Sequence, residues 1–364
     1  MSVPRPGVHA LLPGQTPEGK YILAVLLKRT YTIVPFGLCE RVEEDRPLLG
    51  GDEHYCDPLN TPPRFEADFV PFKLATDVVF DGSAHAPGGR LVRELTATLE
   101  IGSAKKAVAV IGDRVCRHRT GSAPTFTDPE PFKEMPLRYD RAYGGIDVYT
   151  NPRCPFPYPR NTLGRGFAAG DGKAAIDGLQ LPNVEDPTDR LTPDRLVLRK
   201  YEEWAKQPMP AGLGWYSKYS QPRAGLAGIL PADRPTEQMM RKAYADLLPP
   251  GLKEKYLEHP LPTVDFRFFN GASPGLVLPY LKGDEAVRLT NLTPDGVLAF
   301  GLPGDRPAVT LDVGDGPAGG PTVLHTVQLR GGEMEVDLVW RTAVPYPGPD
   351  WLPNMTKAVV SVTG

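Results

Sequence analysis

The densest group of side chains that could ligate a metal ion is the run at residues 52–57 (DEHYCD). In an extended segment alternate side chains share a face, so His54 and Cys56 would point to the same side. A closed tetrahedral zinc site needs two more cysteine or histidine ligands, and the nearest pair, Cys116 and His118, lies far along the chain. The run favours ordinary packing and turn polarity, with a metal site as the alternative.

Covalent catalysis and nucleotide binding find little support in the sequence. No serine or cysteine stands where a neighbouring histidine is expected to activate it. Residues 166–173 (GFAAGDGK) superficially match a phosphate-binding loop, but the glycine spacing differs and Ala174 stands where a serine or threonine must bind magnesium. We expect neither acyl transfer nor nucleotide binding by this route.

Paired carboxylates are frequent, and acid–base catalysis is the chemistry that they could perform. Asp140, Asp147 and Glu285 are the acids that a hydrolase or carbohydrate-active enzyme on a β-sandwich scaffold would use. Adjacent acids beside an apolar strand, such as Asp284 and Glu285, more often start a turn or keep a strand edge soluble. The sequence therefore predicts no catalytic residue, no metal and no cofactor, and an enzyme is the alternative hypothesis.

The segment at residues 135–167 (MPLRYDRAYGGIDVYTNPRCPFPYPRNTLGRGF) is more informative, because it combines arginines and aromatics with loop-forming glycines and prolines. Arginine and tyrosine anchor protein–protein interfaces. The same arginines could instead hold the loops together through carboxylates and carbonyls, and both interpretations stay open. The candidate partner-binding residues are Arg138, Tyr139, Arg141, Tyr143, Arg153, Tyr158, Arg160, Arg165 and Phe167.

The overall charge argues against a nucleic-acid or membrane partner. With 41 basic and 44 acidic residues the formal net charge is −3, so no global basic field attracts polyanions. Bases could stack on the rings of residues 135–167, but the balanced charge disfavours single-stranded nucleic acid. Any charge-driven contact must be local.

Short strands joined by tight turns are the elements that must position these residues. The chain has 42 prolines and 38 glycines among 364 residues, about twice their usual combined share of roughly 12%. Apolar runs or period-two alternation predict the strands. They are expected at 21–35, 77–80, 90–101, 107–111, 263–269, 285–290, 297–302, 308–313, 322–329 and 333–341. We therefore predict a mainly β fold with antiparallel, sandwich-like sheets, long ordered Pro/Gly-rich loops and a few short helices.

The sequence also predicts two helices, one hairpin and a division of the chain into five parts. Helical spacing predicts helices over 194–206 and 236–248, and a hairpin with Gly-Ser-Ala at its tip is expected at 91–113. The Pro-rich tail after Val344 is expected to lie along the surface without building core. The predicted parts are an N-terminal segment (1–19), a β-rich part (20–125), a loop region (126–260), a second β-rich part (261–344) and a tail (345–364). Residues 20–344 are also compatible with one continuous domain.

Cysteine usage and the N-terminal sequence indicate the compartment. Cysteines at 39, 56, 116 and 154 form no Cys-x-x-Cys pair, which predicts free and mostly structural thiols. The first 20 residues lack the apolar run of a signal peptide, and the apolar stretch at 21–27 has the length of a strand. We expect a cytoplasmic protein without a membrane span.

The chain resembles the bacterial domain of unknown function 2169 family, an accessory family found with type VI secretion systems. The resemblance extends in the family's order from about residue 20 to 345. It rests on residues 26–32 (LLKRTYT), 66–89 (EADFVPFKLATDVVFDGSAHAPGG), 111–114 (IGDR), 135–147 (MPLRYDRAYGGID), 161–167 (NTLGRGF), 181–185 (LPNVE), 269–272 (FNGA), 281–285 (LKGDE) and 338–341 (LVWR).

The resemblance implies a non-enzymatic adaptor or chaperone in the cytosol. Such a protein would bind a secretion effector or its Pro-Ala-Ala-Arg tip domain and assist its loading onto the valine-glycine-repeat spike. The family supplies no catalytic residues. A permanent structural subunit of the secretion apparatus is a third hypothesis beside the adaptor and the enzyme.

Overall fold

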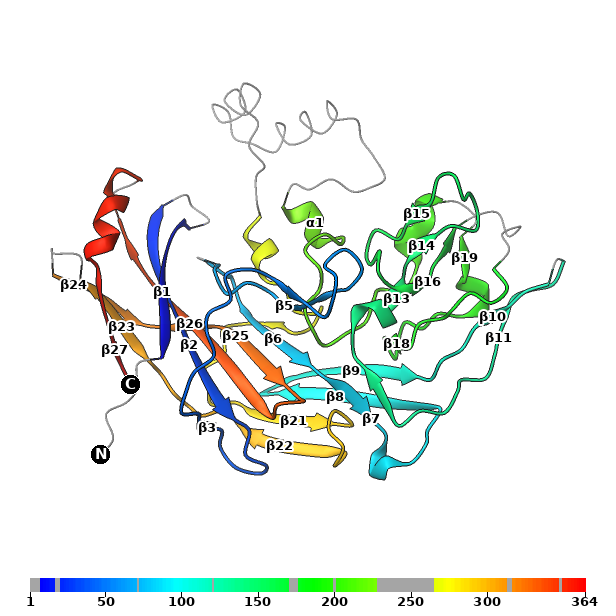
Figure 1. The fold of residues 1–364 in the computed structure, drawn as a ribbon, viewed down its shortest axis with the longest axis horizontal. Helices are drawn as coiled ribbons and strands as arrows, with labels where there is room; N and C mark the ends of the chain where they lie inside the picture. The colour runs from blue at the N-terminus through cyan, green and yellow to red at the C-terminus, as the bar shows by residue number, and fades with distance from the viewer. Residues whose placement is uncertain are drawn as a thin grey trace, which may run out of the picture.

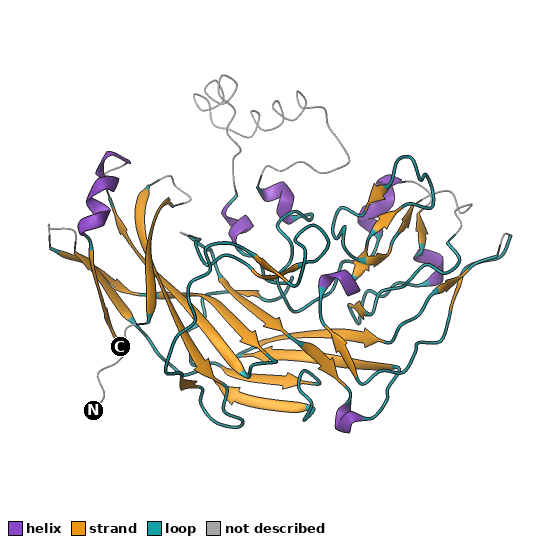
Figure 2. Ribbon diagram, viewed as in Figure 1, coloured by secondary structure: helices purple, strands orange, loops and turns teal. Residues whose placement is uncertain are grey.

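Strands dominate the computed structural model, and the predicted mainly β fold class with antiparallel sheets is confirmed. Two sheets stack in the middle of the molecule, a three-stranded sheet lies at one end and a group of short strands at the other (Figure 1, Figure 2). The residues described by the structure are 7–16, 20–70, 72–119, 121–169, 176–198, 201–227, 265–312, 316–346 and 349–364.

The largest sheet joins segments from both halves of the chain in the order β1-β2-β26-β25-β6-β20, with β3 paired on the end of β2. Its long central strands β2 and β26 run antiparallel, whereas β25 and β6 pair in parallel. β2 is apolar and branched along most of its length, as expected of a strand covered on both faces. The strands are β1 (Val8–Gln15), β2 (Tyr21–Thr32), β3 (Glu40–Arg41), β6 (Thr76–Asp81), β20 (Val277–Leu278), β25 (Val323–Arg330) and β26 (Glu335–Pro345).

A five-stranded sheet in the order β18-β9-β8-β21-β22 forms the second layer. The predicted hairpin is β8–β9, in which Ile101 lies opposite Ala104 and Gly102 adopts φ +55° at the tip. Glycine suits this turn because other residues rarely adopt a positive φ. The strands are β8 (Glu94–Ile101), β9 (Ala104–Ile111), β18 (Val184–Glu185), β21 (Ala286–Thr290) and β22 (Val297–Gly301).

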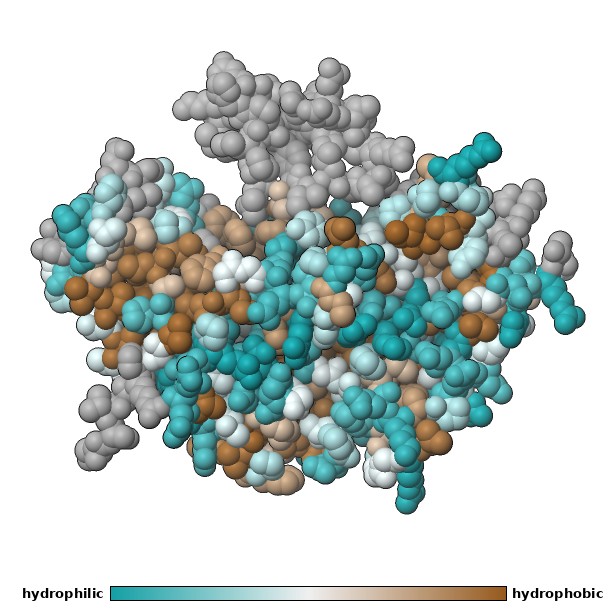
Figure 3. Space-filling view, viewed as in Figure 1, coloured by the Kyte–Doolittle hydropathy of each residue, from teal (hydrophilic) through white to brown (hydrophobic). Residues whose placement is uncertain are grey.

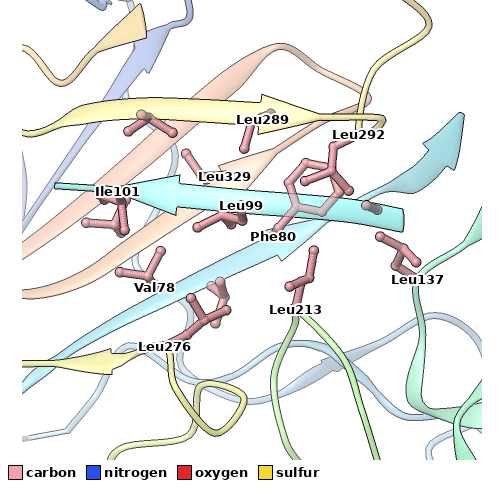
Figure 4. Packing of buried hydrophobic residues seen from close by; sticks show 14 of the residues in the cluster. Val78, Phe80, Leu99, Ile101, Leu137, Leu213, Leu276, Leu289, Leu292 and Leu329 are labelled. Atoms are coloured by element: carbon pink, nitrogen blue, oxygen red, sulfur yellow. The ribbon is translucent and has the colours of Figure 1, made fainter. Parts of the chain in front are cut away.

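The main hydrophobic core lies between these two sheets. Figure 4 shows Leu99 of β8 and Leu289 of β21 close to Phe80 of β6 and Leu329 of β25. All four side chains are buried in one cluster. The period-two pattern of the strands places these apolar residues on the inner faces, which is the arrangement of a β-sandwich.

The outer face of the seven-stranded sheet carries buried charged residues and is covered by residues 41–70 and 72–75. Lys28 Nζ lies 2.8 Å from Asp68 Oδ2, and Lys73 Nζ lies 2.6 Å from Asp77 Oδ2. Ion pairs therefore fasten this segment to the sheet. On the face shown in Figure 3, hydrophilic residues form a broad band across the middle of the molecule, and hydrophobic residues gather beside β1.

The chain after Val344 takes part in a third sheet, so the prediction of a tail that only lies along the surface is wrong. Strand β27 (Val359–Thr363) pairs with β23 (Ala308–Asp312), which also pairs with β24 (Pro317–Pro321). Val360 and Val362 of β27 pack against a buried cluster that includes residues of β2. Strand β1 was also missed, because it is only partly buried and includes proline and glycine.

Two further predictions of secondary structure are wrong. The expected strand at 263–269 is the 3-10 helix η5 (Phe266–Phe269), whose N-cap Asp265 accepts a hydrogen bond from the backbone N–H of Arg267. The expected helix at 194–206 is divided into η3 (Pro193–Arg195), β19 (Val197–Leu198) and η4 (Tyr201–Lys206). The helix predicted at 236–248 lies outside the described residues. The other predicted strands are present, with ends shifted by a few residues.

Short elements complete the described fold. They are β4 (Glu53–His54), β5 (Pro63–Phe65), β7 (Ser83–His85), η1 (Pro87–Gly89), β10 (Cys116–Arg117), β11 (Thr125–Phe126), β12 (Glu134–Pro136), η2 (Tyr139–Arg141), β13 (Tyr143–Gly144), β14 (Ile146–Asp147), β15 (Phe156–Pro157), β16 (Arg165–Gly166), β17 (Ala168–Ala169), α1 (Arg223–Leu226) and η6 (Pro349–Lys357). The four cysteines are unpaired, and burial raises the pKa of Cys39 to about 12 and that of Cys116 to about 11.

Candidate functional site

Residues 135–167 form an ordered set of loops held by a buried asparagine. Asn161 Nδ2 donates hydrogen bonds to the carbonyl oxygens of Tyr139 at 2.7 Å and Tyr143 at 3.1 Å. Gly144 adopts φ +148°, and a Cβ atom there would lie 2.1 Å from the carbonyl oxygen of Asn161. Only glycine permits this close approach. The segment is therefore a folded unit, built on the short pairs β13–β16 and β14–β15.

The four aromatic residues predicted to bind a partner are buried. Tyr143, Tyr158 and Phe167 are each at most 1% exposed, and the ring centroids of Tyr158 lie 5.0 Å from those of both Tyr143 and Phe167. Tyr139 is also buried, and its hydroxyl lies 2.7 Å from Ser273 Oγ. These rings form the interior of the loop unit and do not lie on its surface.

Two of the predicted arginines hold the loops together. Arg138 forms a bidentate pair with Asp140, and its guanidinium lies 4.9 Å from the ring centroid of Tyr55. Arg160 Nη1 donates to the carbonyl of Gln207 at 3.0 Å. The alternative interpretation, in which arginines fasten loops, therefore describes Arg138 and Arg160. Arg153 is exposed.

The remaining two arginines, Arg141 and Arg165, line a polar groove of about 600 Å³ beside β10 and β11. Their Nη1 atoms donate to the same acceptor, Asn183 Oδ1, at 3.2 and 3.3 Å. Burial, and then the positive charge of Arg141, lower the pKa of Arg165. The groove is therefore a place where two partly buried cations converge on one neutral amide.

A second groove, of about 750 Å³, lies where the turn after β2 meets β22 and the β25–β26 turn. Apolar residues form much of its wall, including Leu292, Pro294, Val297 and Met334. Phe36 borders it with a side chain that is 81% exposed. Sequence reasoning missed this site, because its parts come from distant segments. Pro35-Phe36-Gly37, an aromatic inside a turn sequence, was the available signal.

Backbone strain gathers around this apolar groove. Among the described non-glycine residues, those with φ in the left-handed region are Phe36 (+58°), Asn291 (+57°) and Met334 (+54°). Phe36 and Met334 line the groove, and Asn291 precedes its lining residue Leu292. The turn is fixed, since the N–H of Phe36 donates to the carbonyl of Ala299 at 2.6 Å and that of Cys39 to Gly301 at 2.9 Å. Such conformations cluster at functional sites.

The residues considered for catalysis or metal binding have structural partners. Asp147 accepts hydrogen bonds from the backbone N–H of Tyr149 at 2.8 Å, and Glu285 accepts one from that of Lys282 at 2.7 Å. His54 Nδ1 lies 2.8 Å from the carbonyl oxygen of Thr61. Within the described ranges no group of three histidine, cysteine or acidic side chains is arranged to hold a metal ion.

One sequence motif bears on the expectation that no serine or cysteine is activated by a neighbouring histidine. Residues 271–275 (GASPG) have the Gly-x-Ser-x-Gly spacing of a nucleophile elbow. Ser273 is fully buried, and its Oγ donates to the carbonyl of Gly214 at 2.9 Å beside the hydroxyl of Tyr139. Its hydroxyl contacts Tyr139 and Gly214 and, among the described residues, hydrogen-bonds to no histidine, so its contacts are those of a packing residue.

Comparison with known proteins identifies one family. A family described as "Uncharacterized protein conserved in bacteria (DUF2169)" matches residues 18–341. Neither a curated protein nor a solved structure matches the chain. In the part of the chain that the structure describes, no helix has the length and apolar character needed to cross a membrane.

Proposed function

The chain belongs to the DUF2169 family of bacterial proteins, and from that premise we propose that it is a non-enzymatic adaptor or chaperone in the cytoplasm. Its cargo is a type VI secretion effector or the Pro-Ala-Ala-Arg tip domain of one. It holds this cargo until the cargo is loaded onto the valine-glycine-repeat spike.

The apolar groove bordered by Phe36 is the observation that carries this proposal. When a partner covers an aromatic side chain that is 81% exposed on a fixed turn, apolar surface leaves water and the free energy of the system falls. Burial of a phenylalanine side chain contributes about 1.5–3 kcal/mol, and rigid aromatic anchors are typical hot spots of protein interfaces. Because the turn is already held by β22, binding would not have to order it.

Neighbouring residues extend this apolar surface. Leu38, two residues beyond Phe36, is 63% exposed, and Val297 in the groove wall is 37% exposed. His85, Glu134 and Asp295 add polar groups to the lining. An apolar centre with polar groups beside it is the usual arrangement of a reversible protein interface. Cargo held there would be stabilised by mass action.

Two steps test the proposal. A tagged pull-down from native cytosol first recovers the cargo, and the chain is then co-expressed with that cargo. The wild-type chain is expected to raise the yield of soluble cargo and to elute with it in gel filtration. Phe36→Ala should reduce cargo recovery by about tenfold or more, since truncation of a hot spot costs about 2 kcal/mol.

Leu59→Ala is the matched control, because Leu59 is 83% exposed and does not line the groove. It should leave cargo recovery unchanged. Equal cargo yield with and without the chain would overturn the adaptor function. Retention of the chain in fired secretion particles would instead indicate a permanent subunit.

A further inference from the structure

Arg141 and Arg165 approach each other in the polar groove without a carboxylate between them. Both guanidinium groups donate to Asn183 Oδ1, which is neutral. The other amide atom, Asn183 Nδ2, donates to Asp113 Oδ1 at 2.9 Å. Arg165 Nε donates to the carbonyl of Asp140 at 3.1 Å, again a neutral acceptor. Taking a positive charge out of water is costly unless an opposite charge pairs with it.

The described acidic residues offset the charge of this arginine pair only in part, since Asp140 and Asp113 raise the pKa of Arg165 less than burial and Arg141 lower it. Among them, Asp113 comes closest to Arg141 at 3.8 Å, beyond hydrogen-bond distance, and its side chain is 63% exposed. Arg141 Nε is buried and has no hydrogen-bond partner. Arg114, on the same groove, is already paired with the buried carboxylate of Glu185. The lowered pKa of Arg165 means that an additional negative group beside the two guanidinium groups would stabilise the charged form.

The polar groove has the size and the chemistry to receive an additional negative group. Its volume of about 600 Å³ falls within the range of roughly 300–1,000 Å³ that is usual for ligand sites. A guanidinium presents its N–H groups in a planar fork that matches a carboxylate. Asn183 holds both Arg141 and Arg165, and the Asp140 carbonyl also holds Arg165, so their positions are set before a ligand arrives.

We propose that Arg141 and Arg165 bind the carboxylate of an acidic side chain presented by a protein partner. Asp113, Asp128 and Glu130 also line the groove and are exposed. Their negative charges repel a polyanion but tolerate one carboxylate flanked by neutral or basic residues. The inference rests on the proposed function only for the source of the acidic side chain, and it concerns a surface separate from the groove at Phe36.

The test uses the full chain with isotope-labelled arginine and follows the side-chain Nε–Hε resonances during titration at constant ionic strength. The probes are N-acetylglutamate methylamide, its glutamine counterpart and inorganic phosphate. The glutamate probe is expected to shift the Arg141 and Arg165 resonances saturably, and the glutamine probe to leave them unchanged. Loss of one charge-assisted contact in Arg165→Gln should weaken binding by about tenfold or more.

Three further variants make the result specific. Asp113→Asn should tighten binding, because it removes a competing carboxylate, and Arg141→Lys should weaken it, because it keeps the charge but loses the planar fork. Arg306→Gln, a matched loss of charge at an exposed arginine paired with Asp284, should have no effect.

Absence of a saturable shift would overturn the proposal, as would an equal shift with the glutamine probe or an equal loss in Arg306→Gln. Tighter binding of phosphate than of the glutamate probe would overturn the choice of a carboxylate. The titration needs no cargo, so its failure would leave the test at Phe36 unaffected.

Discussion

Phe36 combines two properties that a residue selected for stability alone would not have. Its side chain is almost fully exposed, and its backbone adopts φ +58°. For a residue other than glycine, the left-handed region is less favourable than the right-handed region by about 1–2 kcal/mol of conformational free energy. The protein therefore tolerates backbone strain at Phe36, although the ring of this residue contributes little to the hydrophobic core.

Phe36→Gly should separate stability from binding. Glycine relieves the strain but has more freedom in the unfolded chain, so the free energy of unfolding should stay unchanged or rise by up to about 1 kcal/mol. Cargo recovery should fall as in Phe36→Ala. Urea denaturation measures the stability, and a clear loss of stability would show that the aromatic ring supports the fold.

His325 makes stability depend on pH. Its Nε2 atom accepts a hydrogen bond from Arg341 Nε at 2.9 Å, which requires the neutral ring. Burial, and then the charges of Arg341 and Lys73, hold the pKa of His325 well below its ordinary value of 6.5. The unfolded chain takes up a proton below this value while the folded chain does not, so acid favours unfolding.

The melting temperature should therefore fall as the pH decreases from about 6.5 to about 5, a window in which ordinary carboxylates remain ionised. His325→Gln keeps an acceptor for Arg341 and should flatten this dependence. An unchanged slope in the variant would assign the pH dependence to other groups.

At the scale of elements, ion pairs hold residues 41–70 and 72–75 on the outer face of the seven-stranded sheet and on α1. Arg223 of α1 forms a bidentate pair with Glu66, and both side chains are at most 10% exposed. Arg223 also donates to the carbonyl oxygens of Phe268 at 2.8 Å and Tyr216 at 2.7 Å. One guanidinium thus joins three separate segments of the chain.

Arg223→Met should destabilise the protein by about 3–5 kcal/mol, because it leaves the carboxylate of Glu66 buried without its partner. The double variant Arg223→Met with Glu66→Leu should recover part of that loss. Chemical denaturation of the single and double variants measures the coupling. Arg306→Met, at an exposed ion pair, is the control and should leave stability unchanged.

At the scale of the whole molecule, local patterns in the sequence predicted most of the long strands but not their partners. The β8–β9 hairpin was predictable because its two strands are adjacent and its turn contains glycine. The pairing of β2 with β26 and the parallel pairing of β25 with β6 join distant residues, and no local signal specifies them. The apolar groove was missed for the same reason, because its lining residues come from distant segments.

Residue type alone also could not separate binding residues from packing residues in the loop unit. Tyr143 and Tyr158 have the composition of interface anchors, yet the fold turns them inward. Arg138 and Arg165 are both arginines among glycines and aromatics, but only Arg138 has a carboxylate partner among the described residues. These outcomes depend on which distant segments meet, such as Asn183 beside Arg165.

The pairing of β2 with β26 also affects how the protein is made. Strand β2 ends at Thr32 and its partner begins at Glu335, so at about 5–20 residues per second the ribosome needs roughly 15–60 s to supply the missing strand. During that interval an apolar strand with unpaired backbone groups is exposed to other nascent chains. The yield of this protein in a cell should therefore depend on chaperones that hold β2 until translation reaches β26.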